Sequence, residues 1–111
     1  MLLKILRKKQ SPLLKKYRSL KVELAALEQE LVQNPALGTP LGAQIFKIRL
    51  AIKSKGRGKS GGARVITYLE IEFLTENPGQ EITVVNLISI YDKGDLDTLS
   101  DSDIQNIIRN L

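Results

Sequence analysis

The chain has 111 residues, 42% of them apolar, and a formal net charge of +5. This length and composition predict a single folded domain over residues 1–111 rather than a disordered tail. The sequence contains neither cysteine nor histidine, which excludes disulfides, thiolate metal sites and every mechanism that uses imidazole. Any chemistry must therefore use lysine, arginine, tyrosine or carboxylates.

The start of the chain is basic but does not predict a targeting segment. Its apolar run is broken by Lys4 and lacks a small-residue cleavage site, so we do not expect a signal peptide. No stretch approaches the roughly 20 apolar residues of a membrane span. The expected location is therefore cytoplasmic, with no membrane partner.

The first third of the chain has a helical pattern. Its clearest signal is a set of leucines at helical spacing: Leu20, Leu24, Leu27 and Leu31. Ser19 is placed to cap this helix and Asn34-Pro35 to end it. We expect an earlier, shorter helix over part of residues 2 to 17, disturbed near Pro12. Together these segments predict a basic helical hairpin that packs on a sheet.

Proline and glycine mark a loop near residues 35–42, and strand candidates follow it. They lie near residues 44–53, 63–74 and 81–91. Asn77-Pro78-Gly79 predicts a turn between the last two. The third candidate is apolar at nearly every position, which fits either a central strand covered on both faces or an edge strand met by a partner.

A short helix is predicted at the C-terminal end. Ser100 followed by Asp103 is a capping signal, and Asp101 also suits a helix N-terminus. The apolar stripe of this helix consists of Ile104, Ile107, Ile108 and Leu111. The predicted fold class is α+β, an N-terminal helical hairpin packed on a small twisted antiparallel sheet, with a short C-terminal helix.

The stretch over residues 46–68 is strongly basic and contains no acid. Its seven cations are Lys47, Arg49, Lys53, Lys55, Arg57, Lys59 and Arg64. In the first strand, alternation sends apolar side chains to one face and Lys47, Arg49 and Lys53 to the other. If the strands on either side of the loop pair as a hairpin, Arg64 stands beside this row. Such an array can position phosphates, so we favour a polyanion partner over a purely structural role.

Charge is distributed unevenly along the chain. Residues 1 to 21 carry eight Lys or Arg and no acid, whereas residues 65 to 111 carry nine Asp or Glu against Lys93 and Arg109. The N-terminal basic run fits a solvated helix face and a direct contact with nucleic acid equally well.

Two further motifs are rejected on spacing. The glycine-rich segment at residues 56–61 does not match a phosphate-binding loop, because Lys53 stands at the position before it where such a loop needs its first glycine. The segment also leads into a strand rather than a helix, so we expect no nucleotide cofactor. The acids between Asp92 and Asp103 lack the terminal glutamate and central glycine of a calcium loop. We therefore expect no metal and no other cofactor.

Several segments, taken together and in order, resemble the RelE/ParE superfamily of type II toxin-antitoxin toxins. They are LGTPLG at residues 37–42, FKIRLA at 46–51, KSGGARVITY at 59–68 and IYDK at 90–93. The similarity covers roughly residues 12 to 105. It implies a small α+β fold whose concave sheet face cleaves messenger RNA in the ribosomal A site. The implied partners are a cognate antitoxin protein, the ribosome and messenger RNA.

The resemblance also implies site residues. By position, Lys47 and Arg49 match the paired basic residues of the RelE strand, Arg64 matches the arginine that opens the next strand, and Lys93 lies near a later basic residue. These are the candidate catalytic residues. The candidate RNA-binding residues are Lys53, Lys55, Arg57, Lys59 and Tyr91. The implied reaction is attack of a ribose 2′-hydroxyl on the adjacent phosphodiester, with a lysine as base and arginines stabilising the charged transition state.

The chain departs from the family in two places. Residues 95–100 contain no tyrosine where RelE has one, and Leu2 to Leu6 offers only a strand interrupted by Lys4, so we expect the N-terminal edge strand to be missing or altered. The leading hypothesis is a ribosome-dependent messenger RNA endonuclease. A ParE-like gyrase poison is the runner-up, although it would not need the cations, and a degenerate toxin that only binds antitoxin or RNA is the third.

Overall fold

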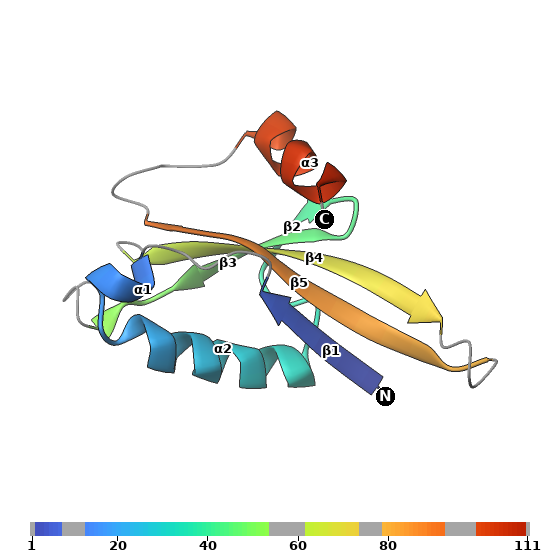
Figure 1. Cartoon of the computed structure of the whole chain (residues 1–111), viewed down its shortest axis with the longest axis horizontal. Coiled ribbons are helices and arrows are strands. Elements are labelled where there is room, and N and C mark those ends of the chain that lie inside the picture. The colour runs from blue at the N-terminus through green and yellow to red at the C-terminus, as the bar shows by residue number, and fades with distance from the viewer. Residues whose placement is uncertain (1, 8–12, 54–61, 74–78, 93–99, 111) are drawn as a thin grey trace.

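A mixed sheet of five strands, in the order β1-β5-β4-β3-β2, forms the centre of the molecule. The computed structural model describes residues 2–7, 13–53, 62–73, 79–92 and 100–110. The strands are β1 (Leu2–Arg7), β2 (Thr39–Gly42), β3 (Ile45–Leu50), β4 (Ala63–Phe73) and β5 (Glu81–Asp92). The helices are α1 (Leu13–Lys16), α2 (Leu20–Gln33) and α3 (Asp101–Arg109). Helices α2 and α3 lie on opposite sides of the sheet (Figure 1).

The predicted N-terminal helical hairpin is wrong. The first segment is strand β1, and only the four-residue helix α1 precedes α2. Strand β1 lies at one edge of the sheet and runs parallel to β5, with Leu3 beside Thr83 and Ile5 beside Val85. The sheet is therefore mixed, and the predicted antiparallel sheet is wrong for this strand.

Strand β1 forms because its side chains alternate as a half-buried strand requires. Leu3 and Ile5 pack against the core below α2, whereas Lys4 between them is exposed. The lysine that interrupts the apolar run in the sequence thus lies on the solvent side of the pleat. The expectation that the N-terminal edge strand is missing is corrected as well, because β1 occupies that position.

The three strands predicted near residues 44–53, 63–74 and 81–91 are confirmed as β3, β4 and β5. Strand β5 lies between β1 and β4, so its apolar sequence is that of an interior strand. Consecutive residues Val84 and Val85 are both fully buried, although they point to opposite faces. Asn77 and Pro78 of the turn predicted before β5 lie outside the described part of the chain. Pro12, where the sequence predicts a disturbed helix, lies outside it as well.

Strand β2 lies where the sequence predicts a loop. All of its residues are exposed, and it forms an edge of the sheet, where a proline such as Pro40 costs no ladder hydrogen bond. The turn into β3 consists of Ala43 and Gln44, with φ of 52° and 66°, the geometry of a two-residue hairpin turn that matches the strand twist. The carbonyl oxygen of Gln44 accepts a hydrogen bond from the backbone N–H of Leu69 at 3.0 Å, which fixes this turn against β4.

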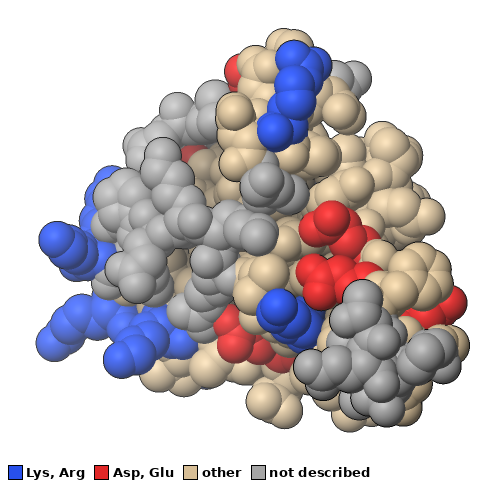
Figure 2. All heavy atoms as spheres, turned by 45° about the vertical axis from the view of Figure 1, so that its right-hand side comes forward, with Lys and Arg blue, Asp and Glu red and all other residues tan. Residues whose placement is uncertain are grey.

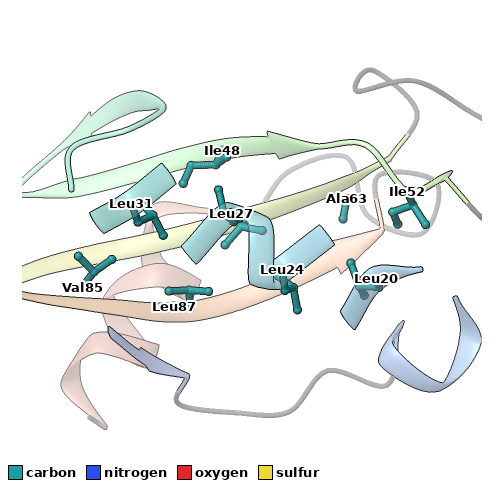
Figure 3. Packing of buried hydrophobic residues seen from close by; sticks show 10 residues of the cluster. Leu20, Leu24, Leu27, Leu31, Ile48, Ile52, Ala63, Val85 and Leu87 are labelled. Carbon is teal, nitrogen blue, oxygen red and sulfur yellow. The ribbon is translucent and has the colours of Figure 1, made fainter. Parts of the chain in front are cut away.

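Helix α2 covers one face of the sheet through the leucines predicted from the helical spacing. Leu20, Leu24, Leu27 and Leu31 are each at most 2% exposed. They pack on Ile48, Val85 and Leu87 of the sheet (Figure 3). Burying a leucine side chain contributes roughly 2 kcal/mol, so this contact is a main source of stability.

Helix α3 covers part of the opposite face and confirms the predicted C-terminal helix. Its Ile104 is buried against a second cluster formed by Ile45, Ile66, Ile88 and Tyr91. The predicted cap is also confirmed, because Ser100 Oγ accepts a hydrogen bond from the backbone N–H of Asp103 at 3.1 Å. In the described segments, no helix is both long enough and apolar enough to cross a membrane.

Candidate nucleic-acid interface

Three of the predicted basic residues lie together on the face of the sheet that carries α3. Arg49 of β3 is the cross-strand partner of Arg64 of β4, and Lys47 is the partner of Ile66. Arg64 in turn pairs with Tyr91 of β5. Cross-strand partners project from the same face. The predicted hairpin pairing is thereby confirmed, and we call Lys47, Arg49 and Arg64 the basic row.

Within the basic row, Arg49 and Arg64 face each other at close range. The hydrogen bond from Leu69 N–H to the Gln44 carbonyl, together with the register, makes Arg49–Arg64 a non-hydrogen-bonded pair. The Cα atoms of such pairs are about 4.5 Å apart. Two guanidinium groups directly opposite each other therefore concentrate positive charge on this face of the sheet.

The members of the basic row differ in exposure. Arg49 is exposed and Lys47 is half-buried, whereas Arg64 is only 3% exposed. The Nη1 of Arg64 donates a hydrogen bond to the carbonyl oxygen of Ala63 at 3.2 Å. A polyanion that approaches this face therefore meets Arg49 and Lys47 first. Arg64 contributes a fixed positive charge from inside the protein, where the lower dielectric strengthens its field.

Tyr91, a predicted RNA contact, lies beside Arg64 but is covered. It is 8% exposed and packs in the same cluster as Ile104 of α3. Its hydroxyl is buried and has no hydrogen-bond partner among the described residues. An unpaired buried hydroxyl costs about 1 to 3 kcal/mol, so the large majority are satisfied. A base can stack on this ring only if α3 shifts.

A hollow of about 320 Å³ lies beside the basic row, between α2 and the edge of β3. Strand β2 pairs with β3 only as far as Lys47, so beyond that residue no described strand pairs with this edge of β3. The backbone N–H and carbonyl of Arg49 point toward this edge, because Arg49 makes a non-hydrogen-bonded pair with β4. Its lining includes the apolar residues Leu27 and Leu37, the cations Lys47 and Arg49, and one acid, Glu30 of α2. Apolar walls with a few polar groups are typical of ligand sites.

Gly38 holds the loop before β2 close to the basic row. Its φ is +106°, and a Cβ added there would lie 2.6 Å from the carbonyl oxygen of Lys47 and 2.8 Å from Cγ1 of Ile48. Only glycine fits such an approach. The glycine that marked a loop in the sequence thus fixes the position of Lys47.

Lys53, a predicted RNA contact, is exposed at the point where the chain leaves β3. Its backbone N–H donates to Oε2 of Glu23 at 3.0 Å, and Oε1 of Glu23 accepts a hydrogen bond from Ser19 Oγ at 2.5 Å. Ser19 is the N-cap residue of α2, but its side chain makes no cap hydrogen bond, so the predicted cap is wrong in this respect. The hydroxyl instead helps Glu23 to anchor the chain at Lys53.

Sequence reasoning missed a contact at the same end of the sheet. The hydroxyl of Tyr17 donates a hydrogen bond to Oδ2 of Asp92 at 2.7 Å, and Asp92 is only 3% exposed. Lys16 lies over the Tyr17 ring at 5.3 Å. No local pattern links these residues, which lie 75 positions apart. The bond ties the segment between α1 and α2 to the end of β5, directly behind the basic row.

The other predicted site residues lie outside the described residues: Lys55, Arg57, Lys59 and Lys93. In the part of the chain that is described, no group of three or more acidic side chains could hold a metal ion.

Charge is separated along the sheet. In Figure 2 a group of Lys and Arg side chains stands at the left edge of the view, and most Asp and Glu side chains lie at its centre and to the right, although further Lys or Arg side chains stand at the top and beside the central acids. Strand β4 follows the same trend, with Arg64 near its start and Glu70 and Glu72 near its end. The basic row therefore belongs to a positive end of the sheet.

A scan against protein-family models and a search of curated proteins both found no match to this chain. The candidate interface is accordingly defined by its own geometry, which is the basic row, the adjoining hollow and the helix that partly covers them.

Proposed function

We propose that this protein is the toxin of a type II toxin-antitoxin pair, of the RelE type, and that it cuts messenger RNA on the ribosome. The observation that carries the proposal is the juxtaposition of Lys47, Arg49 and Arg64 on one face of the sheet. These residues come from two segments through which the sequence resembles the RelE/ParE superfamily. Cations in a row beside an open hollow suit a single-stranded polyanion better than they suit a purely structural surface.

The proposed reaction is an intramolecular transesterification of RNA. The ribose 2′-oxygen bonds to phosphorus while the bond from phosphorus to the 5′-oxygen breaks, which leaves a 2′,3′-cyclic phosphate and a 5′-hydroxyl. Lys47 takes the proton from the 2′-hydroxyl, and water protonates the departing oxygen. Arg49 and Arg64 offset the negative charge that develops on the non-bridging oxygens.

The partners follow from this activity. The substrate is messenger RNA held by the ribosome, so the protein acts in the cytoplasm. A cognate antitoxin protein keeps the basic row from RNA until it is removed. The reaction uses no metal and no nucleotide cofactor.

One observation favours a second candidate, a toxin-like protein that binds RNA or antitoxin without cutting. Arg64 and Tyr91 are 3% and 8% exposed, so in this conformation only part of the proposed site faces solvent. A protein that uses Lys47 and Arg49 for binding alone would need neither of the buried groups.

Induction of the protein in a bacterium, with primer extension on a reporter message, tests the proposal. The informative variant is Lys47→Ala with Arg49→Ala. The control is Arg109→Ala, which removes a positive charge from an exposed position on α3, outside the basic row and outside the N-terminal basic run. We expect cuts within ribosome-bound codons for wild type and control, and at least a 100-fold loss for the site variant, because base and charge stabilisation are both removed.

Two other results would redirect the proposal. Ribosome or RNA binding without cuts, from soluble and folded wild-type protein, would support the binding-only candidate. A DNA damage response without RNA cuts would instead support a gyrase-poisoning activity.

A further inference from the structure

The second half of β4, from Leu69 to Phe73, has an open edge. Strand β3 pairs with β4 only from Ala63 to Tyr68, and beyond that point β4 is flanked by β5 alone. The N–H of Leu69 points away from β5, to the Gln44 carbonyl, so the backbone groups of alternate residues point the same way. Ile71 and Phe73 therefore present backbone hydrogen-bonding groups at an edge that meets no other strand among the described residues. We call residues 69–73 the β4 edge.

The β4 edge is also apolar and hollowed. Ile71 is 60% exposed and Phe73 is 72% exposed, and both project from the same face. A hollow of about 420 Å³ lies where the edge begins, lined by Gln44, Tyr68, Leu69, Glu70 and Ile71. An exposed edge strand with apolar side chains is a template for pairing with another chain.

The charge of the β4 edge decides which kind of chain fits. Glu70 and Glu72 project from the face opposite Ile71, and Glu81 is the cross-strand partner of Phe73. Neither β5 nor the stretch of β4 from residue 65 onward contains a lysine or arginine. Lys4 of β1 projects from the same face as Glu70, but Val84 of β5 lies between them. The β4 edge itself is thus acidic, although the chain as a whole carries a net charge of +5.

A second copy of this chain fits the edge poorly. In an antiparallel pairing about Ile71, Glu70 of one copy would stand opposite Glu72 of the other, twice in the same ladder. A pairing about Glu70 would place that residue opposite itself, and a pairing about Glu72 would do the same for Glu72. Carboxylates directly opposite each other destabilise a ladder, so self-pairing is disfavoured in each of these registers.

We propose that the β4 edge binds an extended segment of a partner protein in which Lys or Arg residues alternate with apolar residues. The segment would add an antiparallel strand through the backbone groups of Leu69, Ile71 and Phe73. Its apolar side chains would lie beside Ile71 and Phe73, and its cations beside Glu70 and Glu72. The inference does not rest on RNA cleavage, because this edge lies at the other end of β4 from Arg64.

Amide chemical shifts of the ¹⁵N-labelled full chain, titrated with short peptides, test the proposal. The probe is an acetylated and amidated Lys-Val-Lys-Val-Lys-Val peptide, and the controls are the Glu-Val analogue and a Lys-Val peptide methylated at alternate backbone nitrogens. We expect shifts concentrated at Leu69 to Phe73 for the probe. Binding of either control should be weaker by at least tenfold, because one opposes the charge and the other lacks the ladder donors.

Two variants examine the backbone and charge contributions separately. Ile71→Pro removes the N–H that points to the open edge and leaves the hydrogen bonds to β5, so it should abolish measurable binding. Glu72→Lys keeps the backbone and should weaken binding roughly threefold to tenfold through charge. The matched control, Glu30→Lys, makes the same change in net charge at an exposed position on α2 and should bind as wild type does.

Several outcomes would overturn the proposal. These are equal binding of the acidic peptide, shifts located elsewhere, or unchanged binding by Glu72→Lys. A concentration-dependent dimer in sedimentation that Ile71→Pro dissolves would assign the edge to a second copy instead. If Ile71→Pro fails to fold, Glu72→Lys and the methylated peptide still decide between these results.

Discussion

The first half of β4, from Ala63 to Thr67, is buried, whereas its second half becomes exposed toward Phe73. Both halves pair with β5, so the difference comes from the other neighbours. The first half lies between β3 and β5 and is covered by α2 on one face and in part by α3 on the other. The second half lacks β3 and loses both helices progressively (Figure 1).

This difference separates two kinds of surface on one strand. The buried half carries Arg64, which neighbouring elements hold in place, as a preorganised charge requires. The open half carries Glu70, Glu72 and exposed apolar side chains, which suit an extended partner segment that becomes a strand when it binds. The proposed RNA site and the proposed docking edge thus lie at opposite ends of β4, one buried and the other exposed.

The largest expected effect is a difference in the free energy of unfolding between two isoleucine replacements, one in each half of β4. Ile66→Ala should destabilise the protein by about 3.5 kcal/mol, because Ile66 is 1% exposed and its loss leaves a cavity under α3. Ile71→Ala should cost no more than about 0.5 kcal/mol, because that side chain is 60% exposed. Urea denaturation of both variants measures the difference. Equal losses would show that the two halves are packed alike.

A second pair of variants tests how firmly the basic row is held. Gly38→Ala should cost about 2.5 kcal/mol, since its Cβ would clash with the Lys47 carbonyl oxygen in addition to the strain of a positive φ. Gly42→Ala is the matched control, with φ of +91° and no atom within 4 Å of the added Cβ, and should cost only about 1 kcal/mol. Thermal unfolding compares them. Equal costs would mean that the loop yields and Lys47 is not fixed by this contact.

Much of this arrangement could be predicted from the sequence, because it depends on local periodicity. The leucine spacing of α2, the alternation in β3 and the Ser100 cap are each set by residues a few positions apart. The position of Arg64 beside the cations of β3 followed from a hairpin and an alternating pattern. Local signals therefore indicated three of the five strands, β3, β4 and β5, and placed the cations of β3 on the face opposite its apolar side chains.

The features that sequence reasoning missed depend on distant contacts. A short apolar run such as Leu2 to Leu6 fits helix or strand, and its pairing with β5, some 80 residues away, decides the outcome. Tyr91 is buried in the cluster to which α3 contributes Ile104, and no pattern in β5 reveals that contact. The hydrogen bond between Tyr17 and Asp92 likewise joins residues that are distant in the sequence.

The contact between Tyr17 and Asp92 gives a third test, at the end of the sheet that holds the basic row. Tyr17→Phe should destabilise the protein by about 1.5 kcal/mol, because it removes a hydrogen bond to a carboxylate that is only 3% exposed. Tyr68→Phe is the control, since Tyr68 is only half-buried and loss of its hydroxyl should cost less than about 0.5 kcal/mol. Chemical denaturation measures both. A neutral Tyr17→Phe would show that this end is not tied together by the contact.

The smallest expected effect concerns α3, which packs against Ile66 in the first half of β4 and against Tyr91 of β5. Ser100→Ala removes the cap from the first turn of α3 and should cost about 1 kcal/mol. Ser19→Ala at the start of α2 should cost about 0.5 kcal/mol, because that side chain makes no cap hydrogen bond to the backbone and its removal loses a part-buried hydrogen bond to Glu23 instead. Hydrogen exchange in α3 locates the change, since loss of the cap should speed exchange there and leave α2 unaffected. If loosening α3 is what admits ligands to Tyr91, Ser100→Ala should also raise the quenching of tyrosine fluorescence by acrylamide, whereas Ser19→Ala should not.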